Sequence, residues 1–308
     1  MIPFDLSIII PVLNAAATLP RLLEALAREV MALPDGLTAE VIAVDNGSRD
    51  GSLEILRRPS PELPLRLIAT DRPGPAAARN AGIRQAAGRV LVLLDADCVP
   101  EAGWLLYWHK VFSSDPDLMI AGGNLLDAEL DSVVARYTAA TKILDAATFA
   151  ATVPGGRPGF YLTANFAMRR SVIDALGLFD EALLPTGEDA DLCFRADAMG
   201  LKRQFFSEIA VHHHHRTSLR GLARQMFKYG HGAAAVHAKW ARPLGWPQVE
   251  VDGIGYVRFA RAVMKTLLFP LRPAGDRRWF EGPLDLVRYG AFLAGRWRGS
   301  LQYRVWVI

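Results

Sequence analysis

Short apolar runs alternate with segments of helical spacing through the first part of the chain. Runs typical of buried strands occur at residues 6–11, 40–44, 65–69 and 89–94. The segments at 18–31 and 74–86, which lie between them, have the periodicity or alanine content of helices. Because strands covered on both faces read as continuous apolar runs, the alternation predicts a mostly parallel sheet flanked by helices.

The pattern loosens after Pro100 and becomes helical toward the end of the chain. Further strands are expected at 118–121, 161–168 and 203–206, and helices at 101–112, 131–151 and 189–199. Beyond residue 216 the spacing indicates helices at 219–240, 256–269 and 284–297. We therefore predict an α/β domain over residues 1–216 and a helical C-terminal region over residues 217–308.

The composition is that of a globular protein in a reducing compartment. Hydrophobic residues make up 51% of the 308 residues and charged residues 22%. Only two cysteines occur, Cys98 and Cys193, so no disulfide framework is implied, and both are expected to pack as small apolar residues. We see neither a signal peptide nor an apolar stretch of roughly 18 residues, which predicts a cytoplasmic protein, at most peripheral on the inner face of the cytoplasmic membrane.

Charge is distributed unevenly along the chain. Residues 217–308 hold 15 Lys and Arg against 5 Asp and Glu, a net charge of +10, whereas residues 1–216 carry −7. Five of the seven tryptophans also lie in the C-terminal region. Basic helices with tryptophan suit an anionic membrane surface, and the same aromatics also suit a homodimer interface. No nucleic-acid-reading motif is recognisable, so a nucleic-acid partner is not expected.

Two carboxylates, Asp95 and Asp97, directly follow the apolar run at 90–94. A strand that ends in Asp-x-Asp places both acids at the carboxyl edge of a sheet, where open α/β folds bind their ligands. Paired oxygen ligands suit Mg²⁺ or Mn²⁺, which commonly hold substrate phosphates. Taken alone, the pair is equally typical of a turn or helix cap.

Polar residues also follow the first two strands. The first strand runs into Pro11-Val-Leu-Asn14 and not into a glycine-rich turn, which counts against a dinucleotide cofactor. The second strand ends at Asp45, an acid that fits a nucleoside contact and a turn cap about equally. A Gly/Pro loop then opens the helix that carries Arg79 and Asn80, which could hold a phosphate or nucleoside, although an isolated arginine is more often solvated.

Taken in order, four segments resemble the family 2 glycosyltransferases, which are inverting sugar-nucleotide enzymes with a Rossmann-like GT-A fold. The segments are Pro11–Asn14, Val44–Ser52, Gly74–Gly82 and Asp95–Asp97, and the resemblance covers about residues 5–216.

The resemblance implies a role for each residue of the donor site. Pro11 and Asn14 would flank the nucleoside, and Asp45 would bind the base ring. Arg79, with Asn80 beside it, would help to hold the nucleotide. Asp95 would lie near the ribose, and Asp97 would coordinate Mg²⁺ or Mn²⁺ at the diphosphate. These assignments are implied by the four segments as they stand in this sequence.

The resemblance extends to three later segments. Glu188 and Asp189 match the family's Glu-Asp motif, with Asp189 as the base that deprotonates the acceptor and Glu188 as an acceptor contact. The alternative is that these acids only stabilise the N-terminus of a helix, where the helix dipole favours negative charge. Within the run His212–His215, His213 would be a second metal ligand, with His215 as second choice, and Asn165 would contact the transferred sugar or the acceptor.

The implied activity is inverting transfer of a sugar from a nucleoside diphosphate, with a UDP-sugar as first choice, to a glycan or lipid-linked acceptor. Polysaccharide, glycolipid or cell-envelope synthesis is the expected setting. A sugar nucleotidyltransferase would want a basic, glycine-rich loop where this chain has Asn14-Ala-Ala-Ala-Thr18. A non-catalytic sugar-nucleotide-binding or membrane scaffold protein would have an incomplete site at Asp97 or Asp189.

Overall fold

The computed structural model describes residues 4–58, 62–151, 158–268 and 281–307. By contacts, the chain divides into two compact units. The first unit comprises Met1–Ala128, Leu144–Glu181 and Glu188–His214, and the second comprises Glu129–Ile143, Ala182–Gly187 and His215–Ile308. The second unit thus takes in two segments that precede residue 216.

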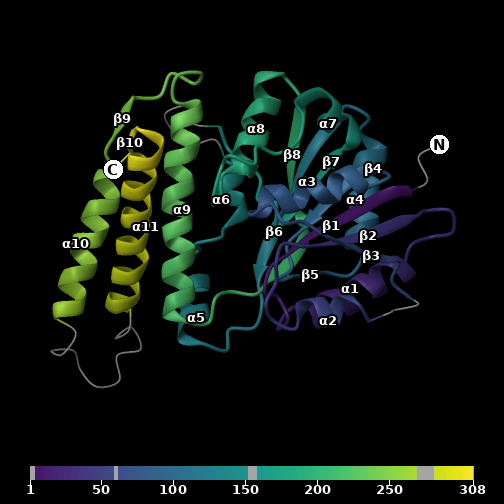
Figure 1. Cartoon of the computed structure of the whole chain (residues 1–308), viewed down its shortest axis with the longest axis horizontal. Helices are drawn as coiled ribbons and strands as arrows, with labels where there is room; N and C mark the ends of the chain where they lie inside the picture. Colours follow the sequence, from purple (N-terminus) through teal and green to yellow (C-terminus); the bar gives the residue numbers. More distant parts are fainter. Residues whose placement is uncertain (1–3, 59–61, 152–157, 269–280, 308) are drawn as a thin grey trace. The chain divides into compact units, whose positions relative to one another are not determined.

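The first unit is built on one eight-stranded sheet (Figure 1). Its strands are β1 (Phe4–Val12), β2 (Ala39–Asp45), β3 (Leu65–Ala69), β4 (Gly88–Leu94), β5 (Cys98–Pro100), β6 (Leu118–Asp127), β7 (Asn165–Arg169) and β8 (Lys202–His213). Its helices are α1 (Leu19–Met31), α2 (Ser52–Leu56), α3 (Pro75–Gln85), α4 (Trp104–Ser114), α6 (Ala146–Ala150), α7 (Arg170–Leu176) and α8 (Glu188–Ala198).

The strands lie in the order β3-β2-β1-β4-β7-β6-β8-β5. Strands β3, β2, β1 and β4 are mutually parallel, whereas β7 runs antiparallel to both β4 and β6. Strand β8 is parallel to β6, and the short β5 closes the edge antiparallel to β8. The parallel half brings the carboxyl ends of β1, β2 and β4 to one edge of the sheet, where ligands of such folds bind.

Alternate strand residues face two different helical layers. Ile8 and Ile10 belong to the hydrophobic core that also holds apolar residues of α1 and α4. Ile9, between them, faces the opposite side, because a Cβ at Gly82 of α3 would clash with it. All three isoleucines are fully buried. This explains why the strand sequence is continuously apolar: both faces are covered.

Most predicted elements are confirmed within a few residues. Among the differences, the strand expected at 118–121 continues to Asp127 as β6, and the short helix α7 is not among the predicted elements. The single helix expected at 131–151 is wrong, since the chain forms α5 (Val133–Ala140) and α6 with a break in which Lys142 has a φ of 50°. The strand expected at 203–206 continues to His213 as β8. The three-residue strand β5 was not predicted, because so short a run has no periodicity.

The second unit is mainly helical and contains α5, α9 (Leu219–Trp240), α10 (Gly253–Leu267) and α11 (Glu281–Tyr303), with a small parallel pair of β9 (Val249–Glu250) and β10 (Trp306–Val307). In Figure 1 the helices α9, α11 and α10 lie side by side. Glycine permits the closest approach: a Cβ at Gly230 of α9 would strike the Phe292 carbonyl oxygen of α11. Residue 269, the last of the helix expected at 256–269, lies outside the described residues.

Among the described residues, no helix combines the length and apolar character needed to cross a membrane.

Candidate functional site

The loops after β1 and β2 are held together by backbone-to-side-chain hydrogen bonds. Asn14, in the left-handed region with a φ of 53°, accepts a 2.8 Å hydrogen bond from the Arg49 amide and donates its own amide to Ser48 Oγ. Asp45 is buried at the end of β2 and accepts from the amides of Gly47 and Ser48 at 3.1 and 3.3 Å. Asp45 therefore does cap a turn in this structure. A nucleoside contact by Asp45 stays a prediction.

Pro11 lies in β1 at the same edge of the sheet, opposite Val44 in the parallel register with β2. The two loops that follow these strands therefore start side by side. The Thr18 hydroxyl, at the start of α1, donates a 2.6 Å hydrogen bond to the Ala96 carbonyl oxygen. This bond fixes the turn between Asp95 and Asp97 to the loop after β1.

Arg79 joins two carboxylates that are far apart in the sequence. Its guanidinium donates to Asp95 Oδ1 and to Glu188 Oε1, each at 2.6 Å. Arg79 and Glu188 are almost fully buried, whereas Asp95 is about one-third exposed. Charge-assisted bonds of this length are the strong ones. The arginine predicted to hold a nucleotide thus lies between the donor-side acid and the start of α8.

The two acids at the start of α8 differ in their surroundings. Glu188 is buried against Arg79, and burial raises its pKa in spite of that partner. Asp189 is half-buried and accepts from the Ala190 amide at 2.8 Å. Burial and the neighbouring Glu188 carboxylate raise the pKa of Asp189 to about 7. A carboxylate with a pKa near neutrality is suited to take a proton at physiological pH.

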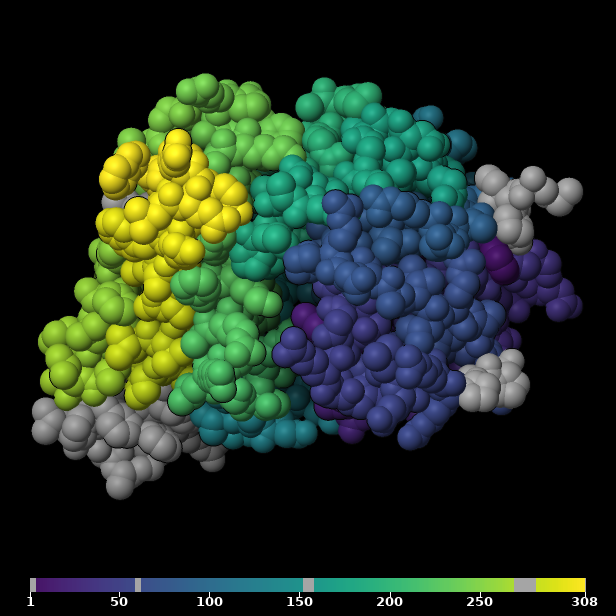
Figure 2. All heavy atoms as spheres, in the orientation of Figure 1, coloured from purple at the N-terminus to yellow at the C-terminus, as the bar shows by residue number. Residues whose placement is uncertain are grey.

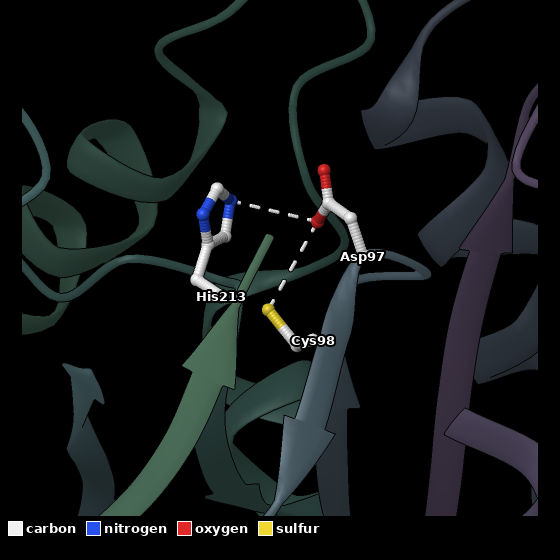
Figure 3. Close-up of side chains that lie close together, drawn as sticks. All are labelled: Asp97, Cys98 and His213. Carbon is white, nitrogen blue, oxygen red and sulfur yellow. Dashed lines mark hydrogen bonds and ion pairs between the residues drawn. The ribbon is translucent and has the colours of Figure 1, made fainter. Parts of the chain in front are cut away.

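Asp97, Cys98 and His213 form a compact group of metal-binding side chains (Figure 3). His213 Nε2 lies 3.5 Å from Asp97 Oδ1, and one ligand atom of each residue lies within 4.8 Å of the others. The sheet causes this grouping, because Cys98 of β5 is the register partner of His213 of β8 and directly opposed residues share a face. The His214 amide also donates to the Asp97 carbonyl oxygen at 2.8 Å.

The four consecutive histidines are separated by the structure. His213 is buried in this group, whereas the His212 side chain is 43% exposed and its Nε2 lies 3.2 Å from Glu101 Oε1. His214 is the last residue of the first unit, and His215 belongs to the second. The first choice among these residues, His213, is therefore the one that lies beside Asp97.

The structure gives protein partners to two asparagines that the sequence predicts to contact substrate. The Asn80 amide donates to the Phe179 carbonyl oxygen and to Glu181, and its oxygen accepts from the Phe179 amide. Asn165 is 0% exposed; it accepts from Trp104 Nε1 and donates to two main-chain oxygens at 2.8 and 2.9 Å. In this structure both side chains hold loops or strands together, and their substrate contacts stay predictions.

Comparison with known proteins assigns the chain to a protein family. The profile of Glycosyl transferase family 2 matches residues 7–177. The pre-mycofactocin glycosyltransferase of Mycobacterium tuberculosis is 33% identical over 97% of this chain. The chain belongs to glycosyl transferase family 2. It spans 63% of the length of the mycobacterial protein, so it corresponds to part of that relative.

Solved structures of similar fold include two glycosyltransferases. A mannosyltransferase of Pyrobaculum calidifontis, in complex with GDP-Man and Mn²⁺, superimposes with a TM-score of 0.64 at 18% identity, covering 98% of this chain and 89% of that one. Glucosyl-3-phosphoglycerate synthase of M. tuberculosis, with Mn²⁺, UDP and glucosyl-3-phosphoglycerate, gives 0.55 at 20% identity, covering 81% and 84%. At these identities the likeness shows the fold. The predicted GT-A fold with a helical C-terminal region is confirmed.

Sequence reasoning about this family 2 chain did not find every residue at the site. Cys98 is buried in the hydrophobic core, as expected of a small apolar residue, and its Sγ also lies 3.9 Å from Asp97 Oδ1, which the sequence does not predict. Its position could have been inferred only from the pairing of β5 with β8, which the sequence pattern does not predict. The bond from Thr18 to the Asp95–Asp97 turn joins residues 78 positions apart and has no local signal.

Proposed function

We propose that this protein is an inverting, metal-dependent glycosyltransferase that moves a sugar from a nucleoside diphosphate to an acceptor hydroxyl. The observation that carries the proposal is the bridge formed by Arg79, which bonds Asp95 and Glu188 at the same time. The bridge keeps the start of α8, and with it Asp189, beside the acid that follows β4. A donor-side carboxylate is thus joined through Arg79 to the residue that precedes the candidate base.

Asp189 is the proposed base. Inversion requires the acceptor oxygen to attack the anomeric carbon from the face opposite the leaving diphosphate, and the hydroxyl proton must go to a nearby group. Glu188 is buried and bonded to Arg79, whereas Asp189 is partly exposed and has a raised pKa. Asp189 can therefore receive the proton. Glu188 would position Asp189 and contact the acceptor. A positioned base contributes roughly 10²–10⁴-fold to such a transfer.

Asp97 and His213 are proposed to hold Mn²⁺ or Mg²⁺. Their ligand atoms already lie close together in a partly buried position, and a carboxylate with an imidazole is an acceptable set for Mn²⁺. The two glycosyltransferases of similar fold were solved with Mn²⁺, one with GDP-Man and one with UDP. Such an ion stabilises the negative charge of a departing diphosphate without a proton donor. His215 becomes the less favoured ligand.

The donor nucleoside is proposed to lie over the loops after β1 and β2. Pro11 and Asn14 would flank it and Asp45 would face the base, since these loops are fixed to each other through Ser48 and Arg49. Asp95 would face the ribose with the side-chain oxygen that Arg79 does not use. A UDP-sugar remains the first choice of donor. Arg79 and Asn80 would act mainly by holding this region in shape, and Asn165 by holding the sheet.

The acceptor is proposed to be a glycan or a lipid-linked sugar used in making polysaccharide, glycolipid or cell-envelope material. A cytoplasmic site of action, peripheral to the membrane, is proposed with it. Both cysteines are buried free thiols, which fits a reducing compartment. Of the two alternatives, family membership disfavours the nucleotidyltransferase. A non-catalytic scaffold would not need the raised pKa of Asp189 beside Glu188.

A donor screen tests the proposal. Purified protein is incubated with Mn²⁺ or Mg²⁺ and a panel of UDP- and GDP-sugars, and binding and release of the nucleoside diphosphate are measured. Asp189→Asn serves as a matched control that should bind the donor and fail to transfer. Inversion is read from the anomeric configuration of the product by NMR. Absence of binding and turnover with every donor would overturn the enzyme assignment, and a retained configuration would overturn the inverting mechanism.

A further inference from the structure

Helix α10 buries small residues and exposes large apolar ones. Gly255 and Ala262 are buried, and Phe259 of the same face lies close to Gly290 of α11. The opposite side carries large apolar residues that are 49–68% exposed: Ile254, Val257, Met264, Leu267 and Leu268. We call these five residues the apolar face of α10. A helix at the surface of a soluble protein normally buries its large apolar residues and exposes polar ones. The apolar face of α10 is therefore typical of a surface that binds a partner.

The spacing of these residues makes a continuous stripe. Ile254, Val257, Met264 and Leu268 stand at helical positions i, i+3, i+10 and i+14, all on one side. At 1.5 Å per residue the stripe is about 21 Å long. The missing i+7 position is Arg261, which is exposed at the centre of the stripe.

Exposed aromatic side chains accompany the stripe. Trp297 of α11 donates from Nε1 to the Tyr256 hydroxyl of α10 at 2.8 Å, so this tryptophan lies against the helix. Trp306 and Val249 are register partners in the β9–β10 pair, and both are exposed. In Figure 2 the lime-green atoms of α10 lie at the surface. Tryptophan is characteristic of surfaces that sit at the boundary between water and lipid.

The most exposed charged side chains on these elements are basic, whereas the acids Glu250, Glu281 and Asp285 are partly or fully buried. Arg258 and Arg261 are exposed on α10, and Arg298 and Arg304 are exposed at the end of the chain. Neither residues 253–268 nor residues 286–308 contain an aspartate or glutamate. Long cationic side chains can lay their stems along an apolar surface and keep their charged ends in a headgroup layer. The surface is therefore complementary to a partner that has an apolar layer beneath a negatively charged outer layer.

We propose that the apolar face of α10, with Arg258 and Arg261, binds the surface of an anionic lipid bilayer, with α10 lying in the plane of the interface. A second copy of the chain is the less favourable occupant. Arg261 stands midway between Ile254 and Leu268, so a two-fold pairing of the stripe with itself would place Arg261 against its own copy. Like charges in that position disfavour self-association, whereas anionic headgroups neutralise them. The proposal does not depend on sugar transfer.

Vesicle flotation tests the proposal with the full chain. Vesicles of phosphatidylcholine alone are compared with vesicles that contain phosphatidylglycerol. We expect binding to the anionic vesicles, weakened by salt, and at least about tenfold weaker binding to the neutral ones. The double variants Ile254→Asp/Leu268→Asp and Arg258→Glu/Arg261→Glu should each lose at least about tenfold in affinity for the anionic vesicles. Tryptophan emission should shift to the blue on binding.

Matched controls come from the first unit. Met31→Asp and Arg57→Glu change an exposed apolar residue and an exposed cation there and should bind vesicles as the wild type does. Circular dichroism and donor binding show that each variant is folded. The proposal is overturned if the wild type ignores anionic vesicles or if the Asp variants bind unchanged. It is also overturned if light scattering shows that Ile254→Asp/Leu268→Asp converts an oligomer to a monomer, which would make the face a contact between copies.

Discussion

The Arg79 guanidinium donates a 2.6 Å hydrogen bond to the Glu188 carboxylate, across 109 residues of sequence. The same guanidinium bonds Asp95 at the same distance, and Asp189 is the next residue after Glu188. One buried cation therefore bonds acids from two separate parts of the chain, the turn after β4 and the start of α8. Removing a single partner from such a group leaves charge uncompensated in the interior, which is more costly than the group itself is favourable.

We predict that Arg79→Met lowers the free energy of unfolding by about 3–5 kcal/mol, because Glu188 then lacks its counter-ion. Arg79→Lys keeps the positive charge, but a lysine ammonium lacks the planar guanidinium that bonds both carboxylates. This variant should remain folded and have mainly a lower kcat. Urea unfolding and steady-state kinetics measure the two effects. Arg84→Met is the control, since Arg84 lies on the same helix in an exposed ion pair with Glu181 and should change stability by less than about 1 kcal/mol. Equal effects of Arg79→Met and Arg84→Met would contradict the bridge.

The pH dependence of the reaction should report Asp189. A base acts in its deprotonated form, so a pKa raised to about 7 means that kcat/KM rises with pH up to that value and then levels off. Glu188→Gln removes the negative neighbour that helps to raise the pKa, so the rising limb should move to lower pH. Asp189→Asn should abolish transfer at every pH.

Donor binding provides the control for both acid variants. Asp189→Asn should bind the nucleotide sugar with an affinity close to that of the wild type, because the donor contacts are proposed to come from other loops. If the rising limb stays in place in Glu188→Gln, Asp189 is not the group that titrates.

Measurements of Mn²⁺ affinity in single variants should show which residues of the Asp97–Cys98–His213 group bind the metal. Asp97→Asn and His213→Ala should each weaken Mn²⁺ affinity by at least about tenfold, measured by the loss of the free Mn²⁺ electron-paramagnetic-resonance signal. Cys98→Ser tests the thiol that faces Asp97 at 3.9 Å. A thiolate ligand would favour softer metals, so Co²⁺ in the wild type would show a sulfur charge-transfer band that Cys98→Ser lacks. His212→Ala changes a partly exposed neighbour that pairs with Glu101, and it should leave Mn²⁺ binding unchanged.

The parallel half of the sheet and the residues at its carboxyl edge were predictable, because buried strands and the acids that follow them are local in the sequence. Asp45 ends β2 and Asp95 directly follows β4. Both strands are parallel neighbours of β1, so their carboxyl ends lie at one edge of the sheet. The pairing of Arg79 with Glu188 was not predictable. The two residues are 109 positions apart, and the local sequence pattern does not indicate which distant segments meet in the fold. His213 was selected from four histidines by resemblance, while its neighbour Cys98 depends on the register of the short β5.

Asn165 is a buried polar residue whose partners in this structure are protein groups, while its predicted substrate contact stays a prediction. Its amide accepts from Trp104 and donates to the carbonyl oxygens of Asn124 and Ile209, so it joins α4, β6 and β8. A Cβ at Gly123 would strike this amide, which explains the glycine in the bulged part of β6. An asparagine in the sequence of a strand gives no sign of whether its partners are main-chain groups or a ligand.

Asn165→Ala should therefore act on stability and not on substrate recognition. The substitution leaves an indole N–H and two carbonyl oxygens without their partner, at about 1–3 kcal/mol for a buried group left unsatisfied. We expect a loss of at least about 3 kcal/mol in the free energy of unfolding, because three polar groups lose their partner at a side chain that is 0% exposed. Gln204→Ala, an exposed amide on β8, is the matched control and should be nearly neutral. At a temperature where the variant is folded, its KM for the acceptor should equal that of the wild type. A raised KM with unchanged stability would instead make Asn165 an acceptor contact, since only a group that touches the acceptor can alter its binding without weakening the sheet.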